Sequence, residues 1–308
     1  MQHLHNIALN VLTGNLQVQP TETLLILTDV HQQEIAKIFY EAGLTITKNT
    51  LFVVMPLLEK SGQEPHPAVT DLMASTDVTL CVTSHSLTHT AARKNACEKG
   101  GRVATMPGVT LSMLEQGALH ANAEEIETLV THYVQLLDAA SDVRIVKDGY
   151  ELAFSIAQRN GIPSTGIVRN SGDYGNIPSG ESYIAPIETS ANGEILIDGS
   201  IANIGVLQEP LLLKIRNGRL EDAIGPDGEK LLSLLGEGNG RIIAEFGIGA
   251  NKSAILCGNV LEDEKVYGTI HIAFGSNAPF GGNNKADVHI DCVVKNPTVY
   301  LDGKELIM

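Results

Sequence analysis

The first 140 residues alternate between short apolar runs and segments whose apolar residues have helical spacing. Buried strands are predicted at 23–29, 51–56, 77–82 and 102–105. Helices are predicted at 3–13, 31–44, 67–74, 86–99 and 123–139. The helix at 31–44 is expected to end at Gly43. Because alternating strands and helices favour a doubly wound, mostly parallel sheet, we expect an α/β domain over residues 1–142.

The pattern changes near residues 139–145. Strand-like runs become frequent, and Asn-Gly or Asp-Gly pairs separate them, as in S-A-N-G-E-I-L-I-D-G-S-I, L-L-L-K-I-R-N-G-R-L and T-V-Y-L-D-G-K-E-L. Such pairs between apolar runs are strong hairpin signals. We therefore expect a β-rich α+β domain over residues 143–308, with one helix at about 227–236.

Two of these apolar runs carry polar side chains. G-T-I-H-I-A-F-G contains His271, and A-D-V-H-I-D-C-V-V contains His289 and Asp291. Alternate residues of a strand share a face, so His289 and Asp291 can reach one ligand, and His271 can join them if the runs pair. Each residue alone fits a core histidine or a turn-capping aspartate. However, a carboxylate between Ile and Cys is costly to bury unless a cation pairs with it, and this set suits zinc, manganese or iron(II).

Two glutamates also lie among apolar residues. Glu181 follows a turn in Y-G-N-I-P-S-G-E-S-Y-I-A-P, and Glu245 lies in R-I-I-A-E-F-G-I-G-A-N. Each can be a buried ligand or an outward-facing residue of a half-solvated sheet. Strand alternation by itself favours the outward-facing interpretation.

The charge and the cysteines limit the partners and the compartment. The net charge is −15 and basic residues form no cluster, which argues against nucleic acid and anionic membranes as partners. The N-terminal residues lack a basic region followed by a long apolar core, so we expect no signal peptide. The four scattered cysteines are typical of reduced thiols. These features predict a cytoplasmic protein.

The loop T-S-H-S-L-T-H-T-A-A-R, residues 83–93, follows a predicted strand and opens a predicted helix, with Ser84 or Ser86 as its N-cap. Open α/β sheets commonly bind ligands at this end of their strands. His85, His89 and Arg93 have i, i+4, i+8 spacing. They therefore form either one exposed polar face or a set of polar contacts to a substrate in a cleft.

The motifs N-I-P-S-G-E, A-E-F-G-I-G-A-N, H-I-A-F-G and H-I-D, in this order, resemble those of the aminopeptidase T family of metalloaminopeptidases. The resemblance implies a homodimeric hydrolase that removes N-terminal residues from small peptides through a metal-activated water. It implies two divalent ions (zinc, cobalt or manganese), with Glu181 or Glu245 as a bridging ligand or general base. The positions that match the family's metal ligands are Glu181, Glu245, His271, His289 and Asp291.

The chain departs from that family after H-I-A-F-G, where Ala278 stands at or near the family's tyrosine and Asn277 is a candidate substrate contact. The 2,5-dihydroxypyridine dioxygenases are a second, more distant resemblance. They imply one iron(II) held by His271, His289 and Asp291, a two-histidine, one-carboxylate set with open positions. The alternatives to the hydrolase are therefore a mononuclear iron(II) ring-cleaving dioxygenase acting on a hydroxylated aromatic, and a non-catalytic binding module.

Overall fold

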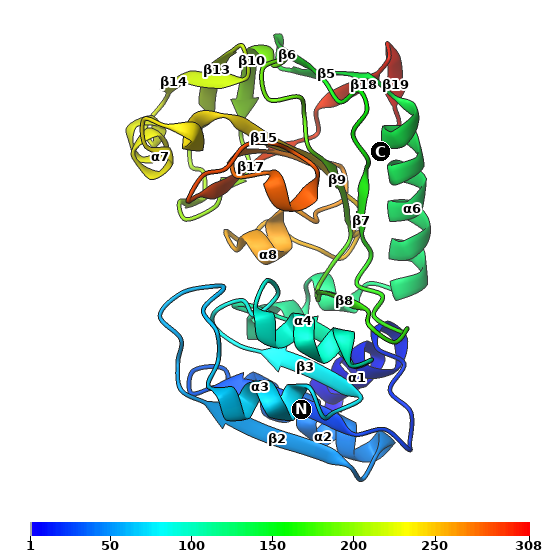
Figure 1. The fold of residues 1–308 in the computed structure, drawn as a ribbon. Coiled ribbons are helices and arrows are strands. Elements are labelled where there is room, and N and C mark those ends of the chain that lie inside the picture. Colours follow the sequence, from blue (N-terminus) through cyan, green and yellow to red (C-terminus); the bar gives the residue numbers. More distant parts are fainter. Residues whose placement is uncertain (1) are drawn as a thin grey trace. The chain divides into compact units, whose positions relative to one another are not determined.

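The computed structural model describes residues 2–308, which form two compact units (Figure 1). The first unit runs to Glu127 and also contains Thr165–Ser179; the second contains Thr128–Ser164 and Gly180–Met308. This division differs from the single boundary predicted between residues 142 and 143. Helix α6 (Ala123–Ala139) begins in the first unit and continues into the second, and a later segment returns to the first.

The first unit contains the predicted parallel sheet. Its five strands have the order β2-β1-β3-β4-β8, with every neighbouring pair parallel. The strands are β1 (Leu24–Asp29), β2 (Thr50–Met55), β3 (Val78–Val82), β4 (Arg102–Thr105) and β8 (Tyr174–Asn176). The helical segments are α1 (Gln2–Asn10), η1 (Val11–Asn15), α2 (Gln33–Ile46), α3 (Pro67–Met73), α4 (Ala91–Glu98), α5 (Leu111–Glu115) and η2 (Ala118–His120).

Two helix ends differ from the prediction. Gly43 does not end α2, which continues to Ile46; an added Cβ at Gly43 would lie 2.8 Å from Leu24 Cδ2, so the glycine allows close packing of the helix on the sheet. Helix α4 begins at Ala91, five residues later than predicted, and its N-cap is Thr90, whose hydroxyl accepts from Arg93 N. The predicted caps at Ser84 and Ser86 are therefore wrong.

The second unit contains two antiparallel sheets, as the hairpin signals indicated. The order in one sheet is β14-β13-β10-β6-β5-β18-β19, and in the other β12-β11-β17-β16-β15-β9-β7. The first comprises β5 (Asp142–Lys147), β6 (Tyr150–Ser155), β10 (Asn192–Ile197), β13 (Leu211–Arg216), β14 (Arg219–Ile224), β18 (Thr298–Leu301) and β19 (Lys304–Leu306). The second comprises β7 (Ile162–Ser164), β9 (Glu181–Ile184), β11 (Ser200–Ile201), β12 (Gly205–Val206), β15 (Ile243–Gly249), β16 (Thr269–Gly275) and β17 (His289–Lys295).

Turn residues account for two of the hairpins. Asn217 and Gly218 join β13 to β14 with φ of 48° and 76°, and Asp302 and Gly303 join β18 to β19 with 48° and 78°. Two successive positive φ values are what a tight hairpin turn requires. Asn192-Gly193, predicted as a turn, instead begins β10. The predicted helix at 227–236 is α7 (Gly228–Leu235); the remaining helical segments are η3 (Asn239–Arg241), α8 (Val260–Asp263) and η4 (Ala278–Phe280).

The two antiparallel sheets pack through apolar side chains. Phe246 of β15 meets Phe154 of β6 edge to face, with ring centroids 5.5 Å apart. Because side chains alternate along a strand, Glu245 and Gly247 of β15 lie on the opposite face of their sheet. That face is therefore available for polar residues. None of the helices within residues 2–308 combines the length and the apolar character needed to span a bilayer.

Candidate metal site

Five predicted ligands lie on one face of four adjacent strands. In the register of the sheet, Gly249 of β15 is opposite Glu181 of β9, and Gly247 is opposite His271 of β16. Ala273 of β16 is opposite both Glu245 of β15 and Asp291 of β17. Residues opposite each other share a face, as do alternate residues of one strand. The structure therefore gathers Glu181, Glu245, His271, His289 and Asp291.

Glu245 connects the two imidazoles. Its Oε1 lies 3.1 Å from His271 Nε2, and its Oε2 lies 3.4 Å from His289 Nε2. The His271 side chain is fully buried, and there is room for its ring only because residue 247 has no side chain: a Cβ there would lie 2.0 Å from Nε2. Glu245 is thus a buried residue of the site and not the outward-facing residue that strand alternation favoured.

His289 and Asp291 complete this group. His289 Nε2 lies 3.4 Å from Asp291 Oδ1. The other ring nitrogen, Nδ1, lies 2.8 Å from the carbonyl oxygen of Ser276. Donation by Nδ1–H to that carbonyl directs the Nε2 lone pair toward the carboxylates, the usual arrangement of a metal-binding histidine. Cys292, next to Asp291 in the strand, lies on the opposite face.

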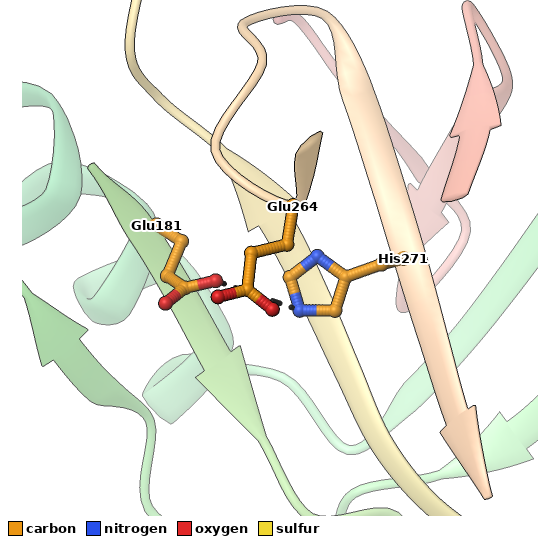
Figure 2. Close-up of side chains that lie close together, drawn as sticks. All are labelled: Glu181, Glu264 and His271. Carbon is orange, nitrogen blue, oxygen red and sulfur yellow. Dashed lines mark ion pairs between the residues drawn. The ribbon is translucent and has the colours of Figure 1, made fainter. Parts of the chain in front are cut away.

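Glu181 belongs to a second cluster, with a residue that the sequence patterns did not indicate. Glu181, Glu264 and His271 bring one ligand atom each within 4.8 Å of one another, and their side chains converge in Figure 2. Glu245, His271 and Asp291 do the same, so His271 is common to the two clusters. Lys265, also unpredicted, is fully buried with its Nζ 3.3 Å from Glu181 Oε1 and paired with Glu264.

The mutual proximity of these groups shifts their pKa values. Burial by itself lowers the pKa of His271, but the carboxylates of Glu245 and Glu181 raise it to about 9. Burial also opposes the charged form of His289, yet Asp291 and Glu245 hold its pKa well above the usual value. For Asp291, burial raises the pKa, and the charge of His289 outweighs burial and lowers it to about 2. In the absence of a metal, protons on the imidazoles therefore balance the carboxylates.

The side chains fit a divalent cation. Within residues 2–308, three buried atoms of the group have no hydrogen-bond partner: Glu181 Oε2, His271 Nδ1 and Asp291 Oδ1. Buried carboxylate oxygens normally have partners, and a cation supplies one. The donors are imidazole nitrogens and carboxylate oxygens, which suit zinc, manganese and iron(II).

Of the four predicted substrate contacts, His85, His89 and Arg93 belong to the first unit and Asn277 to the second. His85 and His89 precede α4, so the predicted helical face of His85, His89 and Arg93 does not exist. Arg93 is buried; its Nε donates to Thr88 O and its guanidinium lies 3.7 Å from the centre of the Tyr174 ring. Asn277 is also buried, and its amide joins Glu188 to Asn284. Arg93 and Asn277 therefore hold local structure together.

Two aromatic residues lie beside the site. Phe280, in η4, meets His289 edge to face at a centroid distance of 5.8 Å. Tyr183 of β9, on the ligand-bearing face, meets Phe280 in the same way at 5.5 Å. His289 keeps 30% of its side-chain surface exposed, whereas His271 is fully enclosed. Phe280 therefore adjoins the accessible histidine, and Tyr183 packs against Phe280.

Comparisons with known proteins recover both families that the motifs resembled. The structure aligns with a 2,5-dihydroxypyridine dioxygenase from Pseudomonas putida KT2440 at a TM-score of 0.80 and 18% identity, covering 99% of this chain and 95% of that one. It aligns with AmpT from Thermus thermophilus at a TM-score of 0.67 and 15% identity, covering 99% of each chain. At these identities the likeness shows a shared fold. No curated protein matches the sequence.

The family assignment comes from the sequence. The model of the NicX family, described as 2,5-dihydroxypyridine 5,6-dioxygenase, matches residues 7–308. This match favours the dioxygenase alternative over the hydrolase that the motif series predicted first. It covers both units of the structure, including the four strands that carry the candidate ligands. The protein belongs to the NicX family.

Proposed function

We propose that the protein is a mononuclear iron(II) dioxygenase that opens the ring of a hydroxylated aromatic of the 2,5-dihydroxypyridine type. The observation that carries the proposal is the position of His271, His289 and Asp291 on adjacent strands β16 and β17. His271 and Asp291 bring ligand atoms within 4.8 Å of each other, and His289 Nε2 lies 3.4 Å from Asp291 Oδ1. Two imidazoles and one carboxylate leave positions open for oxygen and substrate. Membership of the NicX family supports this assignment over other uses of the same donor set.

Each residue has a definite task in this proposal. His271, His289 and Asp291 hold the ion, and the Ser276 carbonyl orients His289 through Nδ1. Without a bound ion Glu245 pairs with Nε2 of both rings, so its carboxylate would lie next to an ion held by these nitrogens. When bound, iron(II) supplies the electron-transfer chemistry that allows oxygen to react with an electron-rich ring.

Substrate binding is assigned to the aromatic side of the site. Phe280 lies next to His289, the more exposed of the two histidines, and Tyr183 packs against Phe280. A planar aromatic substrate can pack on such rings while its hydroxyl group reaches the ion. In this position one flat molecule can pack against the aromatic side chains and bind the metal at the same time.

The experiment is anaerobic loading with iron(II), followed by addition of oxygen and 2,5-dihydroxypyridine or other dihydroxylated aromatics. We expect uptake of one oxygen molecule per substrate consumed, and both atoms of labelled oxygen in the product. Zinc-loaded protein is the control and should consume none. A metal-loaded protein that takes up no oxygen with any of these substrates would refute the proposal.

A second candidate is a two-metal hydrolase of aminopeptidase type. It is favoured by one observation: Glu181 and Glu264 form a second cluster that shares His271 with the first. In this function, a carboxylate such as Glu181 or Glu245 would accept a proton from a metal-activated water. Hydrolysis of aminoacyl amides by zinc-, cobalt- or manganese-loaded protein, without oxygen uptake by the iron form, would establish this alternative.

A further inference from the structure

Lys265 is a buried cation inside the candidate site. It lies between α8 and β16, and its side chain is fully enclosed. Nζ lies 3.3 Å from Glu181 Oε1 and is paired with Glu264 Oε1. An ammonium group is rarely buried so completely unless carboxylates pair with it. Lys265 therefore has a specific electrostatic partner set.

That partner set is one of the two candidate metal clusters. Both carboxylates of the Glu181–Glu264–His271 cluster form ion pairs with Lys265. Among the described residues, Lys265 forms no ion pair with Glu245 or Asp291, the carboxylates of the other cluster. The ammonium therefore pairs with the carboxylates of the first cluster and leaves those of the second available to bind a metal ion.

We propose that the Lys265 ammonium takes the place of a second metal ion, so that the site binds a single divalent cation on the side of His289 and Asp291. The inference rests on the proposed one-metal function and adds the residue that sets the metal count. A divalent ion at Glu181 and Glu264 would lie next to a positive charge that already pairs with both side chains. Removing the ammonium should open that position to a metal.

The protonation of Lys265 agrees with this role. Burial by itself lowers the pKa of Lys265, but the adjacent charges of Glu181 and Glu264 outweigh burial and raise the pKa above its usual value. The geometry alone leads to the same assignment, because the nitrogen lies between two carboxylates and is shielded from water.

The test counts bound manganese(II) by elemental analysis and by electron paramagnetic resonance in the wild-type protein, Lys265→Ala and Lys252→Ala. Lys252 is exposed, and Lys252→Ala removes an equal charge outside the site, so this variant is the matched control. We expect one ion per chain in the wild type and in Lys252→Ala. We expect two in Lys265→Ala, with the exchange-coupled signal of two neighbouring ions.

Several outcomes would overturn the inference. Two ions in the wild type, or no more than one in Lys265→Ala, would show that the lysine does not set the count. A Lys265→Ala variant that stays unfolded in millimolar manganese also counts against it, because the ion should replace the lost positive charge. One ion in the wild type without oxygen uptake would refute the proposed function and leave the inference intact.

Discussion

The position of His271 depends on the absence of a side chain at Gly247. The two residues are opposite each other in the register of β15 and β16. A Cβ at position 247 would lie 2.0 Å from His271 Nε2, whereas ordinary contacts begin at 3.4 Å. The ring would have to move by the difference, about 1.4 Å. It has no free space for this movement because it is fully buried.

Gly247→Ala should therefore weaken metal binding. Disturbing the groups that orient a metal ligand typically costs 10- to 100-fold in affinity, and the displacement here affects the ligand itself, so we expect a loss of about 100-fold. This factor corresponds to about 2.7 kcal/mol at 25 °C. The measurement is a calorimetric titration with manganese(II), together with circular dichroism to establish that the variant is folded.

Gly238→Ala is the matched control for this substitution. An added Cβ at Gly238 meets no atom within 4 Å, and the backbone there is not in the left-handed region. Its manganese affinity should stay within about twofold of the wild type, well below the ~1.4 kcal/mol of a tenfold change. A folded Gly247→Ala variant with wild-type affinity would refute the assignment of His271 as a ligand.

Two further predictions concern charge. Asp291→Asn should lower manganese affinity at least 100-fold, because it removes a buried carboxylate next to His289 Nε2. Asp287→Asn, at an exposed position on the same segment, is the control and should leave the affinity unchanged. Equal affinities of the two variants in a titration would contradict the ligand set. Metal-free protein should lose stability as pH rises from about 6.5, the unfolded value, through about 9, the folded pKa of His271. This loss is about 3 kcal/mol, since a raised pKa stabilises the fold only while the group is protonated. Thermal unfolding in the presence of a chelator measures it, and a melting temperature that rises over this interval would show that the pKa of the buried imidazole is not raised.

Strand periodicity was enough to predict most of the candidate site. His289 and Asp291 are two residues apart, so they share a face whatever the rest of the fold does. His271 and Glu245 join them because their strands pair with β17 and with each other in a register that places all four side chains on the same face. A shift of one residue would move the side chains of a strand to the other face. Whether Glu245 was buried could not be predicted, because alternation places a side chain on a face without determining what covers that face.

The site residues that the sequence did not predict, Glu264 and Lys265, lie outside the helices and strands, where side chains follow no periodic pattern. Glu264 and Lys265 belong to the run E-D-E-K at the C-terminal end of α8, and such a run is typical of a solvated turn. Their burial depends on long-range contacts with Glu181, which is more than 80 residues earlier in the chain. A lysine adjacent to a glutamate just before an apolar strand carries no local signal of such a contact.

Two other differences between the predicted and observed fold, the N-cap of α4 and strand β8, also depend on long-range contacts that the local sequence does not indicate. Several hydroxyl residues between Ser84 and Thr90 could cap α4, and local sequence does not distinguish them. Strand β8 is only three residues long and joins the parallel sheet from a segment that follows β7 of the second unit. A run of three residues, Y-G-N, is too short for a periodic pattern to predict.

In the proposed role of Lys265, a single position separates a one-metal from a two-metal site. Four carboxylates lie in the two clusters, and a scaffold with this donor set can neutralise them with two metal ions or with one metal ion and a lysine. A divalent ion about 4 Å from an ammonium is repelled by about 8 kcal/mol at an effective dielectric constant of about 20. This repulsion exceeds a 100,000-fold change in affinity, about 7 kcal/mol. A charged lysine beside Glu181 therefore offsets much of the attraction that its two carboxylate partners exert on a second ion. The ligands themselves stay in place, so the five-residue motif series alone cannot distinguish a hydrolytic site from an oxygenase site.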